Sequence, residues 1–154
     1  MSGTGTVEVW TRPGTWQGFE NASTGWTLVS SNLGVAGAGA GNATPLDVTD
    51  FVLPGLSTTA LYVTTVNSTL NYTDGTAVGN VAAANSDLQI LEGAGKSYPF
   101  RSTFTPRIWN GTIFYDQVGP PVTATPLPPS LALLGTGLVG LVTLRRNRRI
   151  VRKS

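Results

Sequence analysis

Alternating polar and apolar residues predict a first β-strand near the start of the chain. Within residues 6–11, Val7 and Val9 fall on one face, whereas Glu8 and Trp10 fall on the other. A period of two residues is typical of a half-buried strand. The Arg-Pro-Gly sequence that follows predicts the end of this strand.

Further strands are predicted at short intervals. Residues 60–66 are rich in β-branched and aromatic side chains, which predicts a central strand of a sheet. The Asp-Gly pair at residues 74–75 indicates a hairpin with a type I′ turn. Residues 34–41 are rich in glycine and predict a flexible or bulged connection. The remaining strands are predicted at residues 26–31, 45–53, 70–73, 87–91 and 108–115.

The composition supports an all-β domain with many turns. The 154-residue chain contains 19 glycines and 10 prolines, and 12% of its residues are charged. Together with about seven or eight short strands, this composition predicts an antiparallel β-sandwich of jelly-roll type. Residues 1–118 are long enough for one such domain with a modest core.

The C-terminal part of the chain has a different character and indicates a sorting signal or an anchor. Residues 119–129 are rich in Pro and Thr, residues 130–144 are apolar and uncharged, and residues 145–154 are basic. A helix over the apolar run would be about 22 Å long, shorter than the roughly 30 Å hydrocarbon core of a membrane. We therefore expect a transmembrane segment that holds only temporarily, with the basic tail in the cytoplasm by the positive-inside rule.

The order of these three parts closely resembles the PEP-CTERM sorting signals of Gram-negative bacteria. The residues that carry the resemblance are a proline motif and a basic stop-transfer cluster, namely Thr125, Pro126, Leu127, Pro128 and Pro129, and Arg145, Arg146, Arg148 and Arg149. The motif departs from the commonest Pro-Glu-Pro core and is similar to the variant Val-Pro-Leu-Pro-Ala. The resemblance implies recognition and cleavage near the proline motif by a membrane exosortase. An ordinary single-pass tail anchor is the alternative interpretation.

The same resemblance implies export to the cell surface or an extracellular matrix, with a transient stay in the inner membrane. Exosortase substrates begin with a secretory signal peptide, whereas residues 1–5 lead directly into the first predicted strand. We therefore expect the gene to extend upstream of Met1 and to encode a signal peptide and at least one further strand.

The distribution of charge argues against nucleic-acid binding. The formal charge of the whole chain is +2, but most of the basic residues lie in the tail. Residues 1–118 contain four basic and eight acidic residues, which gives a formal charge of −4. An acidic body repels phosphate. The absence of Cys and His removes thiolate chemistry, the commonest general base and the commonest metal ligand. We expect no enzyme activity, cofactor or metal. Two alternatives stay open, glycoside hydrolysis by Glu8, Glu20 and Glu92 and calcium binding by the loop aspartates, for which turn and cap roles are favoured, namely Asp47, Asp50, Asp74, Asp87 and Asp116.

Aromatic side chains are the main candidates for ligand binding. The four Trp and four Tyr residues would form either the core of the domain or a platform on which sugars stack. Core packing is the favoured role of each tryptophan, and Trp16, within the turn-rich residues 14–25, is the one expected to be exposed and the candidate for stacking on a sugar. The Gly-x-Gly-x-x-Gly pattern at residues 135–140 is interpreted as accidental, because no βαβ unit surrounds it.

Two classes of function are therefore open. The first is a non-catalytic exported cell-surface or biofilm-matrix protein, which an exosortase sorts and cleaves and whose partners are the membrane and exopolysaccharide. The second is a carbohydrate-binding β-sandwich module that the same signal delivers to the surface. The sequence alone does not name a ligand or an oligomeric state.

Overall fold

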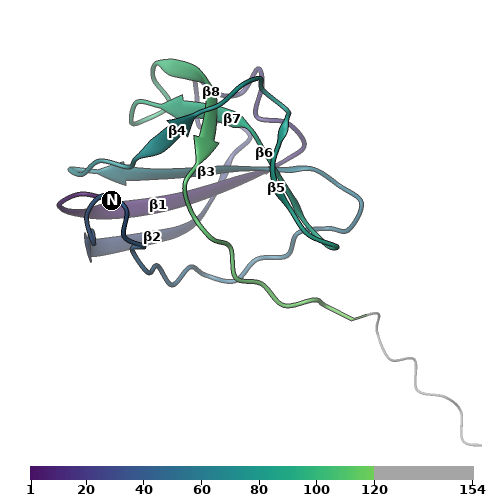
Figure 1. Ribbon diagram of the computed structural model, residues 1–154, viewed down its shortest axis with the longest axis horizontal. Coiled ribbons are helices and arrows are strands. Elements are labelled where there is room, and N and C mark those ends of the chain that lie inside the picture. The colour runs from purple at the N-terminus through teal and green to yellow at the C-terminus, as the bar shows by residue number, and fades with distance from the viewer. Residues whose placement is uncertain (120–154) are drawn as a thin grey trace, which may run out of the picture. The chain divides into compact units, whose positions relative to one another are not determined.

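The computed structural model describes residues 1–119, and this part of the chain contains β-strands and no helix (Figure 1). The chain divides into two units, Met1–Ile113 and Phe114–Ser154, and the eight strands of the described part all belong to the first unit. The strand pairings are antiparallel, so the predicted all-β class is confirmed. The predicted proline motif, transmembrane segment and basic cluster lie outside the described residues. No helix within residues 1–119 has the length and hydrophobicity needed to cross a membrane.

The largest sheet has three strands in the order β2-β1-β3. These strands are β1 (Thr4–Pro13), β2 (Thr27–Ala36) and β3 (Thr59–Val66). Val7 and Val9 of β1 are buried, with 3% and 5% of their surface exposed, which confirms the face that the alternation predicted. The predicted end of the first strand at the Arg-Pro-Gly sequence is also confirmed.

The central strand of this sheet is β1, so the prediction that residues 60–66 form a central strand is wrong. Strand β3 pairs with β1 along its whole length and with no second strand among the described residues. High β-branched and aromatic content reflects how well side chains pack on a sheet surface, not how many neighbours the strand has. Ala60, Tyr62 and Thr64 are buried on one face of β3 although the strand lies at the sheet edge.

Two smaller sheets complete the first unit (Figure 1). One has three strands in the order β4-β8-β7, and the other pairs β5 with β6. Their bounds are Tyr72–Asp74 for β4, Val81–Ala84 for β5, Gln89–Leu91 for β6, Gly93–Lys96 for β7 and Thr103–Trp109 for β8.

Three further predictions about local structure are wrong. The Asp-Gly pair at residues 74–75 does not turn a hairpin, because β4 pairs with the distant β8. Residues 45–53 form no strand and run as an irregular connection, in which the Asp47 carbonyl accepts a hydrogen bond from Asn32 Nδ2 at 2.7 Å. The last strand lies earlier than residues 108–115, because β8 ends at Trp109.

Aromatic residues form much of the small core. The Phe100 ring lies 4.8 Å from Tyr62, 5.5 Å from Trp10 and 6.0 Å from Trp26, measured between ring centroids. Phe100 belongs to the turn between β7 and β8, whereas the other three residues belong to or adjoin the largest sheet. The aromatic cluster of Trp10, Trp26, Tyr62 and Phe100 therefore joins the β4-β8-β7 sheet to the β2-β1-β3 sheet.

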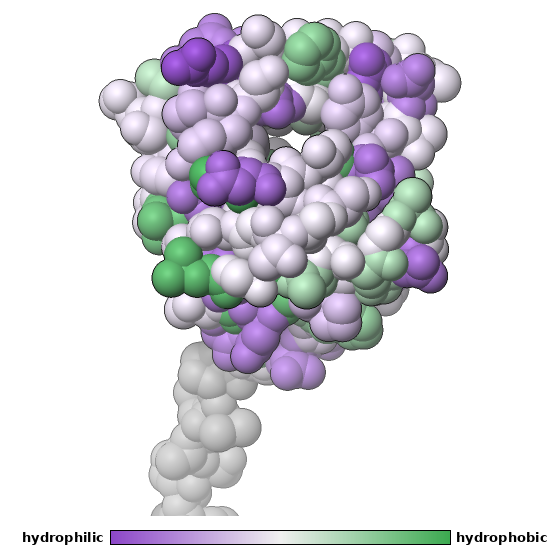
Figure 2. All heavy atoms as spheres, turned by 90° about the vertical axis from the view of Figure 1, so that its left-hand side faces the viewer, coloured by the Kyte–Doolittle hydropathy of each residue, from purple (hydrophilic) through white to green (hydrophobic). Residues whose placement is uncertain are grey.

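The surface of the described residues is largely polar on the face shown in Figure 2. Neutral and hydrophilic residues dominate there, and the hydrophobic ones lie in separate groups. Hydrophobic side chains exposed singly are normal in soluble proteins, whereas a broad apolar patch would indicate a docking surface.

Candidate functional site

A surface hollow of about 440 Å³ lies where three segments of the first unit meet. The segments are β1, the connection between β1 and β2, and the turn between β7 and β8. Its volume is within the range of about 300–1,000 Å³ that is typical of small-ligand sites. The residues that line it are Glu8, Trp10, Asn21, Ala22, Ser23, Tyr98, Pro99 and Phe100.

Strand β1 supplies the charged part of the hollow. Glu8 and Trp10 share the face of β1 opposite the buried valines, as the alternation predicted. Trp10 Nε1 donates a hydrogen bond to Glu8 Oε2 at 3.1 Å. This bond holds the carboxylate beside the indole ring, so a negative charge and an aromatic surface lie next to each other.

The connection between β1 and β2 forms one wall and is braced by its own side chains. The Arg12 guanidinium lies over the Phe19 ring, 3.4 Å from its centroid, and Arg12 also donates to the Thr15 carbonyl. Trp26 Nε1 donates to the Phe19 carbonyl at 2.8 Å. These contacts fix the connection at both ends, which keeps Asn21 and Ser23 at the hollow.

Lys96 ties the same wall to the β4-β8-β7 sheet. Its ammonium group donates to Asn21 Oδ1 at 3.3 Å, to Thr103 Oγ1 at 2.6 Å and to the Arg101 carbonyl. Burial lowers the pKa of Lys96, and the Glu20 carboxylate opposes that shift. Because Lys96 engages the side-chain oxygen of Asn21, the amide nitrogen of Asn21 is left as a donor for a ligand.

The turn between β7 and β8 forms the opposite wall. Two backbone hydrogen bonds close it, from Ser97 N to the Ser102 carbonyl at 3.0 Å and from Arg101 N to the Ser97 carbonyl at 2.9 Å. The Tyr98 hydroxyl donates to Glu8 Oε1 at 3.5 Å. Burial of the phenol and the nearby Glu8 charge raise the pKa of Tyr98, so its hydroxyl stays protonated and acts as a donor to Glu8.

Trp16, the residue predicted to stack on sugars, lies outside this hollow. Its side chain is half-buried, and its indole nitrogen lies close to Gly93, where an added Cβ would approach it to 3.6 Å. Tyr98 is one of the aromatic residues that the sequence offered as stacking candidates, but it was not singled out there, and Glu8 and Asn21 were not assigned to a sugar site. Only the pairing of Glu8 with Trp10 had a sequence signal, because both fall on one face of the predicted first strand.

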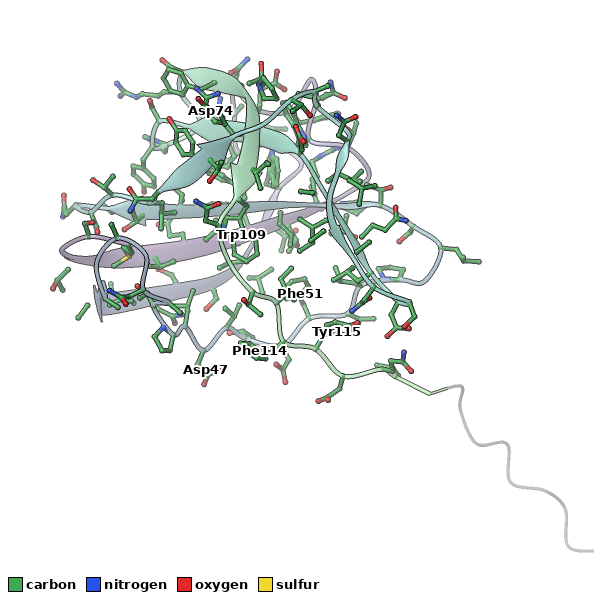
Figure 3. The ribbon with its side chains drawn as sticks, in the orientation of Figure 1. Asp47, Phe51, Asp74, Trp109, Phe114 and Tyr115 are labelled. Atoms are coloured by element: carbon green, nitrogen blue, oxygen red, sulfur yellow. The ribbon has the colours of Figure 1, made fainter. Side chains whose placement is uncertain are left out.

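The aspartates do not form a metal site in the described part of the chain. No group of three or more His, Cys, Asp or Glu residues within residues 1–119 is arranged to hold a metal ion. Figure 3 shows Asp47 and Asp74 on opposite sides of the first unit. Asp74 instead pairs with Arg107, at 3.2 Å between Oδ1 and Nη1.

Glu92 is a buried acid with a structural role. Its carboxylate accepts hydrogen bonds from Thr76 N at 2.6 Å, from Ala77 N at 3.0 Å and from the Thr76 hydroxyl at 3.0 Å. Burial alone would raise the pKa of Glu92, but these hydrogen bonds outweigh it and hold the pKa below its ordinary value. These bonds tie Thr76 and Ala77, which follow the Asp-Gly pair, to Glu92.

Comparisons of this chain with protein-family models, with curated proteins and with solved structures find no match. The chemistry of the site is therefore argued from its own residues. One carboxylate, one amide, two hydroxyls and several aromatic rings line the hollow. This set suits a ligand that carries both hydroxyl groups and an apolar face.

Proposed function

We propose that this chain is a non-catalytic exported protein of the cell surface or the exopolysaccharide matrix, sorted and cleaved by an exosortase-type membrane protease. The observation that carries the proposal is the order of proline motif, apolar run and arginine cluster within residues 125–149. In the full proposal, a jelly-roll-like β-sandwich precedes a transmembrane sorting helix at residues 130–144 and a basic cytoplasmic tail.

The physical properties of the tail support processing over permanent anchoring. Three glycines and two threonines dilute the apolar run, and a helix of about 22 Å does not match a membrane core of roughly 30 Å. The arginine cluster stops translocation and stays on the cytoplasmic side. The proline motif keeps the preceding chain out of a helix, which suits a protease that needs extended backbone.

A second candidate function is a carbohydrate-binding module delivered by the same signal. The hollow beside Glu8 and Trp10 favours it, because aromatic rings and polar groups meet there in a space of about 440 Å³. Both candidates place the described residues outside the inner membrane.

The proposed export can be tested in the organism that carries the gene. An epitope inserted after Gly41, in the exposed connection between β2 and β3, should be detected on intact cells. Detection only after lysis would contradict export. A variant with Ala in place of Arg145, Arg146, Arg148 and Arg149 serves as the comparison, and it should be retained less well before processing.

A further inference from the structure

We propose that the hollow between β1, the β1–β2 connection and the β7–β8 turn binds a neutral or amino-substituted sugar and rejects uronic acids. This inference rests on the second candidate function above, a carbohydrate-binding module. It adds where the sugar binds and which charge the sugar carries. A hollow of about 440 Å³ has room for roughly one or two sugar residues, as judged from the usual size of small-ligand sites.

The polar groups of the hollow match the needs of neighbouring sugar hydroxyls. Each carboxylate oxygen of Glu8 accepts one hydrogen bond from within the protein, Oε2 from Trp10 and Oε1 from Tyr98. A carboxylate can accept about four hydrogen bonds in total. Glu8 can therefore accept further hydrogen bonds from a ligand. Asn21 and Ser23 at the facing wall supply donors, so acceptors and donors face the ligand from different sides.

The aromatic groups of the hollow supply an apolar surface for the C–H face of a sugar ring. Tyr98 is 41% exposed, so part of this residue is accessible to a ligand. Trp10 is half-buried, with its ring edge-to-face against Phe100 at 83°. Packing an apolar ring face on these side chains removes apolar area from water. Phe100 is anchored in the core, which keeps this part of the hollow rigid.

The charge of Glu8 determines which sugars are accepted. Lys96, which contacts Asn21 in the wall, already donates hydrogen bonds to Asn21, Thr103 and the Arg101 carbonyl. Residues 1–118 also carry a formal charge of −4. A uronate is therefore repelled, whereas a sugar ammonium group can make a charge-assisted hydrogen bond with Glu8, about twice as strong as a neutral one.

The test is titration of the full-length protein, purified in mild detergent, with sugar oligomers of equal length. The probes are trimers of glucosamine, N-acetylglucosamine, glucose, galactose, mannose and glucuronic acid, followed by tryptophan fluorescence and calorimetry. We expect glucosamine to bind more tightly than the neutral sugars, and glucuronate not to bind. Absence of binding by all neutral and amino sugars, or glucuronate binding as tight as that of glucosamine, would overturn the proposal.

Two pairs of variants assign the binding to this hollow. Glu8→Gln should weaken glucosamine binding about tenfold or more, the usual scale for losing a charged hydrogen-bond partner, whereas Asp50→Asn, outside the hollow, should change nothing. Tyr98→Ser should weaken binding of every sugar, whereas Tyr72→Ser, at a tyrosine of similar exposure on β4, should not. Equal effects within either pair would overturn the assignment. Loss of sugar binding would leave cleavage of the tail unaffected. The proposals of sugar binding and of tail sorting can therefore be contradicted separately.

Discussion

The Trp10 indole nitrogen donates to the Glu8 carboxylate at 3.1 Å, joining two side chains two positions apart on one face of β1. The opposite face of the same strand buries Val7 and Val9. Strand β1 therefore contributes to the core from both faces, and its Glu8–Trp10 face also lines the hollow. A ligand at the hollow would contact the central strand of the sheet, which has a neighbour on both sides.

The first prediction concerns Phe100, which joins two sheets through the aromatic cluster. Phe100→Ala should reduce the free energy of unfolding by about 3–5 kcal/mol, because it removes a buried ring and leaves a cavity. The backbone of Phe100 has a positive φ of 51°. Alanine at this position has the same backbone strain, so the change in the free energy of unfolding measures the loss of the ring. Phe104→Ala, at a phenylalanine that is 43% exposed, should cost much less. Similar losses for both variants in urea unfolding would contradict this role of Phe100.

The second prediction concerns the pH dependence that Glu92 confers. The pKa of Glu92 in the folded chain lies below the ordinary value of 4.5, so its stabilising effect is fully present above that pH. The effect is lost as the pH falls through the lowered pKa, when the folded carboxylate becomes protonated. Glu92→Gln should therefore lower the Tm at pH 7, and the gap to the native protein should narrow below about pH 4.

Thermal unfolding between pH 3 and pH 7 measures this effect. The control is Asp50→Asn, which removes one negative charge from an exposed residue of the β2–β3 connection and should leave the Tm at pH 7 nearly unchanged. A Tm difference between the Glu92→Gln variant and the native protein that stays constant over the whole pH range would contradict the hydrogen-bonded carboxylate.

The third prediction compares two glycines. A Cβ added at Gly5 would lie 2.4 Å from the Val66 carbonyl oxygen and 2.7 Å from Ser68 Cβ. Gly5→Ala should therefore lower the free energy of unfolding by about 1–3 kcal/mol, since the backbone must move to make room for the added methyl group. A Cβ at Gly55 meets nothing within 4 Å, and Gly55→Ala should stabilise by up to about 1 kcal/mol by restricting the unfolded chain. Chemical denaturation measures both, and a Gly5→Ala variant as stable as the native protein would refute the close approach of β1 to β3.

The sequence was sufficient for the class of fold and for the strands with regular alternation. The period of two at Val7, Glu8, Val9 and Trp10 identified both faces of β1 correctly. The partners of the strands could not be predicted, because pairing depends on contacts between distant residues. Strand β4 pairs with β8, more than thirty positions away in the register Tyr72 to Trp109, and no local pattern marks that choice.

The candidate site shows the same division between local and distant information. The neighbourhood of Glu8 and Trp10 follows from strand periodicity alone. Asn21 and Tyr98 reach the hollow through contacts that cross the fold, the first through Lys96 and the second through Glu8. Trp16 was expected to be exposed because its neighbours are turn-forming residues. A turn-rich sequence, however, does not indicate which side chains of a loop point toward the domain.

The fourth prediction concerns the proline motif. Replacing Pro126 and Pro128 with Ala should leave membrane insertion intact, because both residues precede the apolar run at residues 130–144. Cleavage should be blocked, because the altered motif is no longer held out of a helix. Membrane fractionation followed by C-terminal immunodetection checks both parts. A variant that is still cleaved as efficiently as the native protein would show that the motif does not direct processing.

The most direct measurement of the central claim is the intact mass of the mature protein, taken from the same organism with and without its exosortase. The proposed sorting predicts that the enzyme-containing strain yields a protein cut near residues 125–129, lacking the apolar run and the arginine cluster. The strain without the enzyme should retain the full tail through Ser154 in the membrane fraction. A mature surface protein that still carries the complete arginine tail in the presence of the exosortase would contradict sorting and favour a permanent tail anchor.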